Sequence, residues 1–127
     1  MLRILVVEDD ASIRTTVAEA LEDMGYLVET ASNGAEALAK VREDGFAAIV
    51  LDLMMPVMTG WEFLDACGED LLAEQIPVAV VSAAYAPGAV ASRPAVSAVL
   101  SKPFDLDVLE AIVQRLTARR RTASEPS

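Results

Sequence analysis

Runs of aliphatic residues alternate along the chain with segments whose apolar residues recur every three or four positions. The apolar runs occupy residues 3–7, 48–53, 77–82 and 98–100, and residues 27–31 alternate weakly between apolar and polar positions as a further strand. The uninterrupted run at 48–53 predicts a strand buried on both faces, as in a parallel sheet covered by helices. The intervening segments predict helices, and the inner face of the first is formed by Ile13, Val17, Leu21 and Met24.

Local signals set the ends of the predicted helices. Ser12 or one of the preceding aspartates caps the first helix, and Gly25 ends it. A second helix ends near Gly45, and a third covers residues 61–72 with a candidate interruption at Gly68. These elements all fall between the aliphatic runs.

The last two segments differ in how clearly their sequence predicts a helix. The pattern weakens over residues 83–94, where Pro87, Gly88 and Pro94 disfavour a long helix, so we expect the fourth helix to be short or irregular. The final helix is capped by Asp105, and its inner side carries Leu106, Leu109, Ile112, Val113 and Leu116.

The regular alternation of five strands with helices predicts an α/β fold. The expected architecture is a doubly wound, three-layer, five-stranded parallel sheet, with the flavodoxin-like strand order 2-1-3-4-5. We predict one domain over residues 1–118, followed by a flexible basic and polar tail at 119–127. Three consecutive arginines in that tail suit a helix C-terminus, whose dipole favours cations.

Charge and composition exclude several classes of function. The formal net charge of −10 argues against a nucleic-acid surface. Histidine is absent, which excludes histidine-based acid/base catalysis, and the single cysteine, Cys67, cannot form an internal disulfide and is expected to be buried. No signal peptide or membrane-length apolar run is present, so we expect no membrane insertion and a cytoplasmic location.

Polar side chains follow four of the predicted strands. The acidic run Glu8-Asp9-Asp10 comes after the first strand, and Asp52 lies at the carboxyl end of the third. Ser82 lies at the end of the fourth strand, and Lys102 follows the fifth. A single aspartate after a strand more often makes a turn or caps a helix. Parallel strands, however, bring all of these residues to one edge of the sheet, where ligands bind in open α/β folds.

The acidic residues at this edge need a compensating charge. Like charges a few ångströms apart repel by roughly 1 to 4 kcal/mol per pair, depending on the effective dielectric. A Mg²⁺ ion held by carboxylates beside a phosphate would relieve this repulsion. Lys102 can pair with a carboxylate or a phosphoryl oxygen, and Ser82 can donate a hydrogen bond. The set predicts a phosphoryl-accepting site in which Asp52 is the nucleophile and becomes an acyl phosphate.

With these motifs the chain resembles the receiver domains of two-component response regulators. The likeness runs through ILVVEDD at 4–10, LDLMMP at 51–56, Gly60, VSA at 81–83 and KPF at 102–104. The resemblance implies that Asp52 is the phosphoacceptor, that Glu8, Asp9, Asp52 and the backbone carbonyl of Met54 bind Mg²⁺, and that Ser82 and Lys102 contact the phosphoryl group. Asp10 matches no family role and is expected to serve the start of the first helix.

The resemblance also implies the partners. The phosphoryl donor would be a sensor histidine kinase or a phosphotransfer protein, and the signal would pass to a downstream protein or an attached output domain. The chain would not be an enzyme beyond catalysing its own phosphorylation and slow autodephosphorylation. The slow loss is expected because neither Met54 nor Ala84, which would flank the phosphoryl group, can position a hydrolytic water.

One position departs from the family. Val99 stands three residues before the lysine, where members usually carry an aromatic residue that turns inward on activation. We therefore hypothesise that the signal passes through the loop at 83–88, with Tyr85 as a candidate. The alternative is a receiver-like module that signals by protein binding without phosphorylation.

Two other classes fit less well. A haloacid dehalogenase-type phosphatase would need an aspartate where this chain has Met54. A nucleotide-binding domain would need a glycine-rich turn after the first strand instead of an acidic one.

Overall fold

The computed structural model describes residues 1–43, 45–83 and 93–124. Five strands form one parallel sheet in the order β2-β1-β3-β4-β5, which confirms the predicted topology. The strands are β1 (Arg3–Val7), β2 (Leu27–Ala31), β3 (Ala48–Leu51), β4 (Val78–Ser82) and β5 (Val96–Ser101). The helices described are α1 (Ala11–Asp23), α2 (Gly34–Glu43), α3 (Gly60–Ala73) and α5 (Leu106–Ser124).

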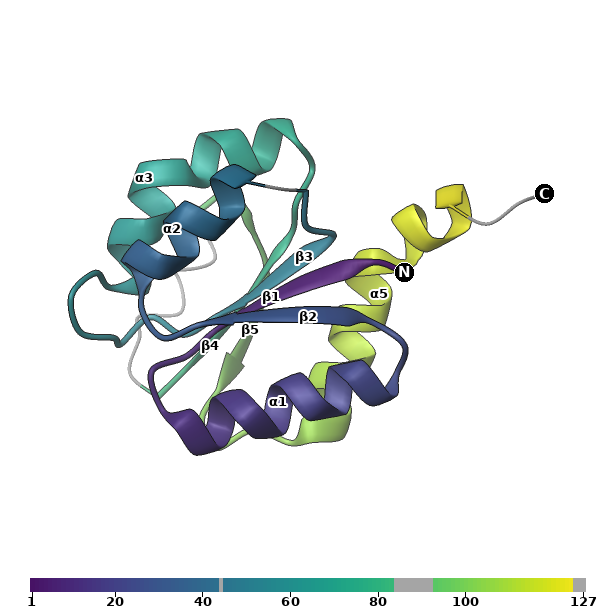
Figure 1. Cartoon of the computed structure of the whole chain (residues 1–127), viewed down its shortest axis with the longest axis horizontal. Helices are drawn as coiled ribbons and strands as arrows, with labels where there is room; N and C mark the ends of the chain where they lie inside the picture. Colours follow the sequence, from purple (N-terminus) through teal and green to yellow (C-terminus); the bar gives the residue numbers. More distant parts are fainter. Residues whose placement is uncertain (44, 84–92, 125–127) are drawn as a thin grey trace.

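The helices cover both faces of the sheet (Figure 1). Helices α2 and α3 lie on one face, and α1 and α5 lie on the other. Alternate residues of β1 supply the two cores, because Leu5 and Val7 pack toward α2 and α3 whereas Ile4 and Val6 pack toward α1 and α5. The central strands β1, β3 and β4 are buried along almost their whole length, as the aliphatic runs predicted.

The predicted caps are present at the helix starts. Asp10 is the N-cap of α1, and its carboxylate accepts a 3.0 Å hydrogen bond from the N–H of Ile13. Asp105 accepts a 2.9 Å hydrogen bond from the N–H of Asp107 at the start of α5. Gly25 follows α1 with a φ of 99°, a left-handed conformation that glycine adopts without strain.

Several predicted boundaries need correction. Helix α3 runs through Gly68 without the expected interruption, because the buried side chains on either side of it, including Leu64 and Leu71, hold the helix against the sheet. Strand β3 ends at Leu51 and not at residue 53, and β5 covers 96–101 instead of 98–100. Helix α5 extends past residue 118, so the boundary between domain and tail stays a prediction. The short fourth helix and the role of Tyr85 fall on residues 84–92, outside the described residues.

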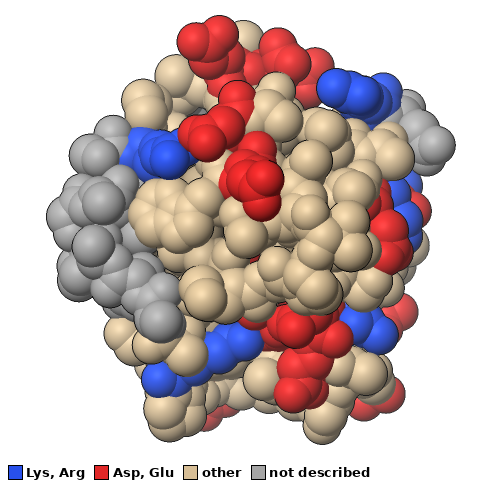
Figure 2. Space-filling model, turned by 90° about the vertical axis from the view of Figure 1, so that its left-hand side faces the viewer, with Lys and Arg blue, Asp and Glu red and all other residues tan. Residues whose placement is uncertain are grey.

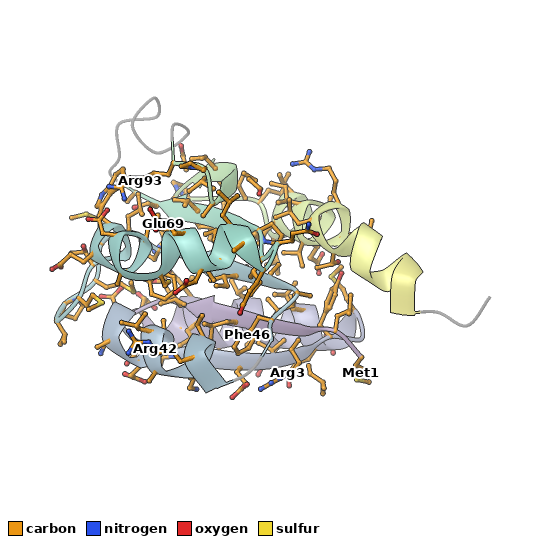
Figure 3. The ribbon with its side chains drawn as sticks, turned by 90° about the horizontal axis from the view of Figure 1, so that it is seen from above. Met1, Arg3, Arg42, Phe46, Glu69 and Arg93 are labelled. Atoms are coloured by element: carbon orange, nitrogen blue, oxygen red, sulfur yellow. The ribbon has the colours of Figure 1, made fainter. Side chains whose placement is uncertain are left out.

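Two arginines lie over aromatic rings. Arg3 at the start of β1 has its guanidinium carbon 4.9 Å from the centroid of the Phe46 ring (Figure 3). Arg93, just before β5, lies 5.1 Å from the centroid of Trp61 and pairs with Asp65 of α3. These contacts tie the peripheral segments to the sheet and to α3.

None of the helices in the described ranges is long and apolar enough to cross a membrane.

Candidate functional site

The ends of the parallel strands deliver the predicted site residues to one edge of the sheet. The N–H of Asp52 donates to the carbonyl of Val7 at 3.0 Å, and the N–H of Lys102 donates to the carbonyl of Ser82 at 3.0 Å. The register thereby places the residue after β3 beside the end of β1, and the residue after β5 beside the end of β4. Figure 2 views the molecule from this side, where basic and acidic side chains lie next to one another in the lower half.

Three carboxylates meet at this edge. One ligand oxygen from each of Glu8, Asp9 and Asp52 lies within 4.8 Å of the others. Glu8 and Asp52 are 4% and 3% exposed, whereas Asp9 is exposed to solvent. The site therefore has two buried carboxylates and a third that is exposed to solvent. The strand order predicted that these residues lie together, but not which of them are buried.

Lys102 contacts both buried carboxylates. Its ammonium nitrogen lies 2.5 Å from Oε1 of Glu8 and 3.2 Å from Oδ2 of Asp52. Burial lowers the pKa of Lys102, but the hydrogen bond to Glu8 and the charges of Asp52 and Glu8 outweigh burial and raise its pKa above the ordinary value. The lysine is thus held in its charged form.

The pKa of Glu8 is raised from 4.5 to about 7. Burial is the largest cause, and the neighbouring Asp52 adds to it, whereas the hydrogen bond from Lys102 opposes the shift. The hydrogen bond from Lys102 therefore does not offset the burial of Glu8 and the repulsion from Asp52.

The Ser82 hydroxyl lies at the same edge. Its side chain is fully buried, and within the described segments its Oγ has no hydrogen-bond partner. A buried hydroxyl without a partner is unfavourable unless a ligand or a water completes it. Ser82 is therefore placed to donate to a group that enters the site.

The loop from Asp52 to Gly60 is shaped by close contacts. The N–H of Met54 donates to Oδ1 of Asp52 at 3.2 Å, and the N–H of Gly60 closes the loop on the carbonyl of Leu53 at 3.0 Å. A Cβ atom at Gly60 would lie 2.5 Å from the Asp52 carbonyl oxygen, so only glycine fits there. Met54 is brought to the site, while the role of its carbonyl as a metal ligand stays a prediction.

The same loop holds a strained residue that sequence reasoning missed. Val57 has a φ of 67° and is 82% exposed. The N–H of Met58 donates to the carbonyl of Pro56 at 2.7 Å, which makes Val57 the centre of a γ-turn. A β-branched residue is unfavourable in this conformation, and no turn signal other than the preceding proline points to it.

Arg14 is a second residue that sequence reasoning missed. Its guanidinium nitrogen NH1 donates to the carbonyl oxygen of Glu8 at 2.9 Å and lies 3.4 Å from that of Asp9. Arg14 lies just after the first turn of α1, a turn without acidic residues, where a cation opposes the helix dipole. A positively charged residue near the N-terminus of a helix was the feature of the sequence that could have indicated a role for Arg14.

Two further expectations concern residues near the site. Asp10 is exposed and caps α1, as predicted for a residue outside the carboxylate cluster. Val99 packs with its aliphatic side chain against the core under α2 and α3. It carries no ring, so the inward-turning aromatic switch of the family has no counterpart at this position.

The three carboxylates fit a Mg²⁺ site. Ligand atoms about 2.1 Å from one octahedral ion lie roughly 3 to 4 Å apart, so oxygens spread over at most 4.8 Å need only small side-chain shifts. The all-oxygen donor set also matches a hard divalent cation. Glu8, Asp9 and Asp52 are the residues that would hold it.

Sequence comparisons show which known proteins this chain is similar to. The family model described as the response regulator receiver domain matches residues 4–114. The response regulator Rre1 of Synechocystis sp. is 35% identical over 127 residues, which cover 98% of this chain and 55% of Rre1. The response regulator MprA of Mycobacterium leprae is 37% identical over 94% of this chain and 53% of MprA. The chain thus spans about half the length of these curated relatives.

Solved structures show the same fold. The chemotaxis response regulator CheY4 of Vibrio cholerae is 36% identical with a TM-score of 0.81, over 91% of this chain and 98% of CheY4. The response regulator TrrA of Thermotoga maritima, solved in complex with Mg(2+)-BeF, is 31% identical with a TM-score of 0.80, over 91% of this chain and 99% of TrrA.

Proposed function

Because this chain belongs to the response regulator receiver domain family, we propose that it takes a phosphoryl group onto Asp52 in a Mg²⁺-dependent reaction. The observation that carries the proposal is the buried Asp52 carboxylate held 3.2 Å from the Lys102 ammonium, beside Glu8 and Asp9. The Mg(2+)-BeF complex of TrrA supports the same chemistry by analogy. The conformation of the phosphorylated chain would carry the signal.

The transfer follows from the chemistry of the residues at the strand ends. An oxygen of Asp52 attacks phosphorus in line, the bond between phosphorus and the donor's histidine nitrogen breaks, and the imidazole leaves with that electron pair. The product is a 4-aspartyl phosphate. Lys102 releases a carboxylate oxygen and pairs with a phosphoryl oxygen, which offsets charge in the transition state.

Ser82 completes the set of donors. Its buried hydroxyl is free to donate to a second phosphoryl oxygen, a contact that it does not make before transfer. A Mg²⁺ ion bound by Glu8, Asp9 and Asp52 would neutralise charge on the incoming group. We propose that Ser82 gains this partner on transfer and that the site changes conformation through it.

A groove beside the site supports a protein as the donor. It has a volume of about 500 Å³, and its lining includes Ile13, Val17, Lys102, Phe104 and Leu106. Lys102 also contacts Asp52 at 3.2 Å, so this mostly apolar groove adjoins the carboxylate site. We propose that a phosphohistidine-bearing segment of a sensor histidine kinase or phosphotransfer protein binds there, and that this chain is located in the cytoplasm.

Beyond its own phosphorylation and slow loss of phosphate, we propose no enzymatic activity. The second candidate function is signalling by protein binding without phosphorylation, and the aliphatic Val99 is the observation that favours it. The complete set of Asp52, Lys102 and Ser82 supports the phosphoacceptor function over this alternative.

Intact mass spectrometry after incubation with acetyl phosphate tests the proposal. We expect one phosphoryl adduct that requires Mg²⁺ and is absent in Asp52→Asn. Asp10→Asn is the matched control, because it removes a neighbouring exposed charge while asparagine still caps α1, and it should be phosphorylated as the wild type is. A folded wild-type protein without any adduct would favour the binding module.

A further inference from the structure

Arg14 connects helix α1 to the turn that presents the acidic pair. Its NH1 donates to the carbonyl oxygen of Glu8 at 2.9 Å and approaches the carbonyl oxygen of Asp9 at 3.4 Å. Both oxygens lie between the end of β1 at Val7 and the start of α1 at Ala11. These two carbonyl oxygens therefore lie outside the hydrogen-bond ladder of the sheet. The Arg14 side chain donates to them where a strand would supply a backbone N–H.

The turn is fixed at several other points. The N–H of Glu8 donates to the carbonyl of Ala31 at 3.0 Å, and the N–H of Asp10 lies 3.3 Å from Oε2 of Glu8. These contacts hold the two ends of the turn. The peptide units of Glu8 and Asp9, from which two of the three site carboxylates project, are held on their carbonyl side by Arg14.

We propose that Arg14 is a positioning residue for Mg²⁺, which sets the backbone of Glu8 and Asp9 so that their carboxylates converge with that of Asp52. This inference rests on the proposed metal site. Arg14 contacts carbonyl oxygens and not carboxylates in the described contacts, so it acts through the backbone of its neighbours. The guanidinium suits this role because its NH1 group carries two hydrogens and can donate to both carbonyl oxygens.

The direction in which Mg²⁺ affinity changes when Arg14 is replaced distinguishes a positioning role from the effect of its positive charge. Arg14 brings a positive charge near a cation site, so removing that charge alone would strengthen Mg²⁺ binding. Loss of positioning would weaken it, because Asp9 is exposed and its carboxylate would no longer be directed to the cluster. The two explanations of Arg14 therefore predict opposite changes in Mg²⁺ affinity.

The test is a calorimetric Mg²⁺ titration of wild type, Arg14→Met, Arg14→Lys and the control Arg115→Met, each verified as folded by circular dichroism. Arg115 is an exposed arginine of α5, so its replacement removes the same charge elsewhere. We expect about tenfold weaker binding for Arg14→Met, as for a lost charge-assisted hydrogen bond. Arg14→Lys should recover part of the lost Mg²⁺ affinity, because the lysine ammonium can reach one of the two carbonyl oxygens.

The outcomes distinguish this inference from the proposed function. If Arg14→Met binds Mg²⁺ as tightly as Arg115→Met or more tightly, Arg14 does not position the acidic pair, although the metal site stands. If the wild type does not bind Mg²⁺, the metal site and the role of Arg14 are both refuted. A merely structural role would lower the unfolding temperature of Arg14→Met but leave the affinity of the folded protein unchanged.

Discussion

Burial of Glu8 couples the stability of the metal-free protein to pH. The pKa of this carboxyl is raised from 4.5 in the unfolded chain to about 7, because burial disfavours its charge and Asp52 adds repulsion that the hydrogen bond from Lys102 only partly offsets. Between these two values the folded protein keeps a proton that the unfolded chain has released. Folding then takes up a proton, so stability falls as pH rises.

The size of the effect follows from the two pKa values. Each pKa unit corresponds to about 1.4 kcal/mol, so the free energy of unfolding should fall by on the order of 3 kcal/mol from Glu8 alone. The contribution is fully present below pH 4.5, where Glu8 is protonated in both states. It is lost by the time the pH passes 7, where Glu8 is ionised in both states.

Urea unfolding from pH 4.5 to 8 in the presence of a chelator measures this loss. Glu8→Gln cannot ionise, so it should remove the part of the pH dependence of the unfolding free energy that comes from Glu8. Glu19 is an exposed residue of α1, and Glu19→Gln should keep that pH dependence. Mg²⁺ competes with the proton on Glu8, so its affinity should be about tenfold higher at pH 8 than at pH 6. Identical pH dependence in wild type and Glu8→Gln would refute the assignment of the raised pKa.

Other positions give predictions of opposite sign. Val57→Gly should raise the free energy of unfolding by about 0.5 to 1 kcal/mol, because glycine removes the strain of the positive φ but loses chain entropy. Val57→Ala, which keeps a Cβ atom, should gain less in the same urea unfolding experiment. Gly60→Ala should cost about 2 kcal/mol or more, because its Cβ would lie 2.5 Å from the Asp52 carbonyl oxygen. Gly68→Ala in the same helix should raise the free energy of unfolding by about 1 kcal/mol, because nothing lies within 4 Å of the new Cβ. Equal changes in unfolding temperature for Gly60→Ala and Gly68→Ala would contradict the packing argument. Met54→Gln should shorten the lifetime of the phosphorylated protein by placing a polar group beside it, and an unchanged decay of the phosphoprotein mass would refute this.

The sheet was predictable because its signals are local and repeat along the chain. The aliphatic runs of the central strands β1, β3 and β4 are buried on both faces. Parallel strands also have to end at a common edge, which brings Asp52 and Lys102 together from positions fifty residues apart. Asp10 at the start of α1 and Asp105 at the start of α5 were found for a similar reason, because a capping side chain acts on the next few residues.

The remaining features depend on contacts that the sequence does not display. Gly68 has the composition of a helix break, but packing of α3 on the sheet overrides the local preference. The strain at Val57 follows from how its loop closes on Leu53 and Gly34. The contact of Arg14 with the carbonyl of Glu8 needs the strand and the helix to be placed first.

Chemical mapping of the phosphoryl group tests the central claim most directly. The protein phosphorylated with acetyl phosphate and Mg²⁺ is reduced with borohydride, which converts an aspartyl phosphate to homoserine, and its peptides are then sequenced by mass spectrometry. We predict homoserine at position 52 and aspartate at positions 9 and 10. Homoserine at another position, or none at position 52 in a protein that carries a phosphoryl adduct, would contradict the assignment of Asp52 as the phosphoacceptor.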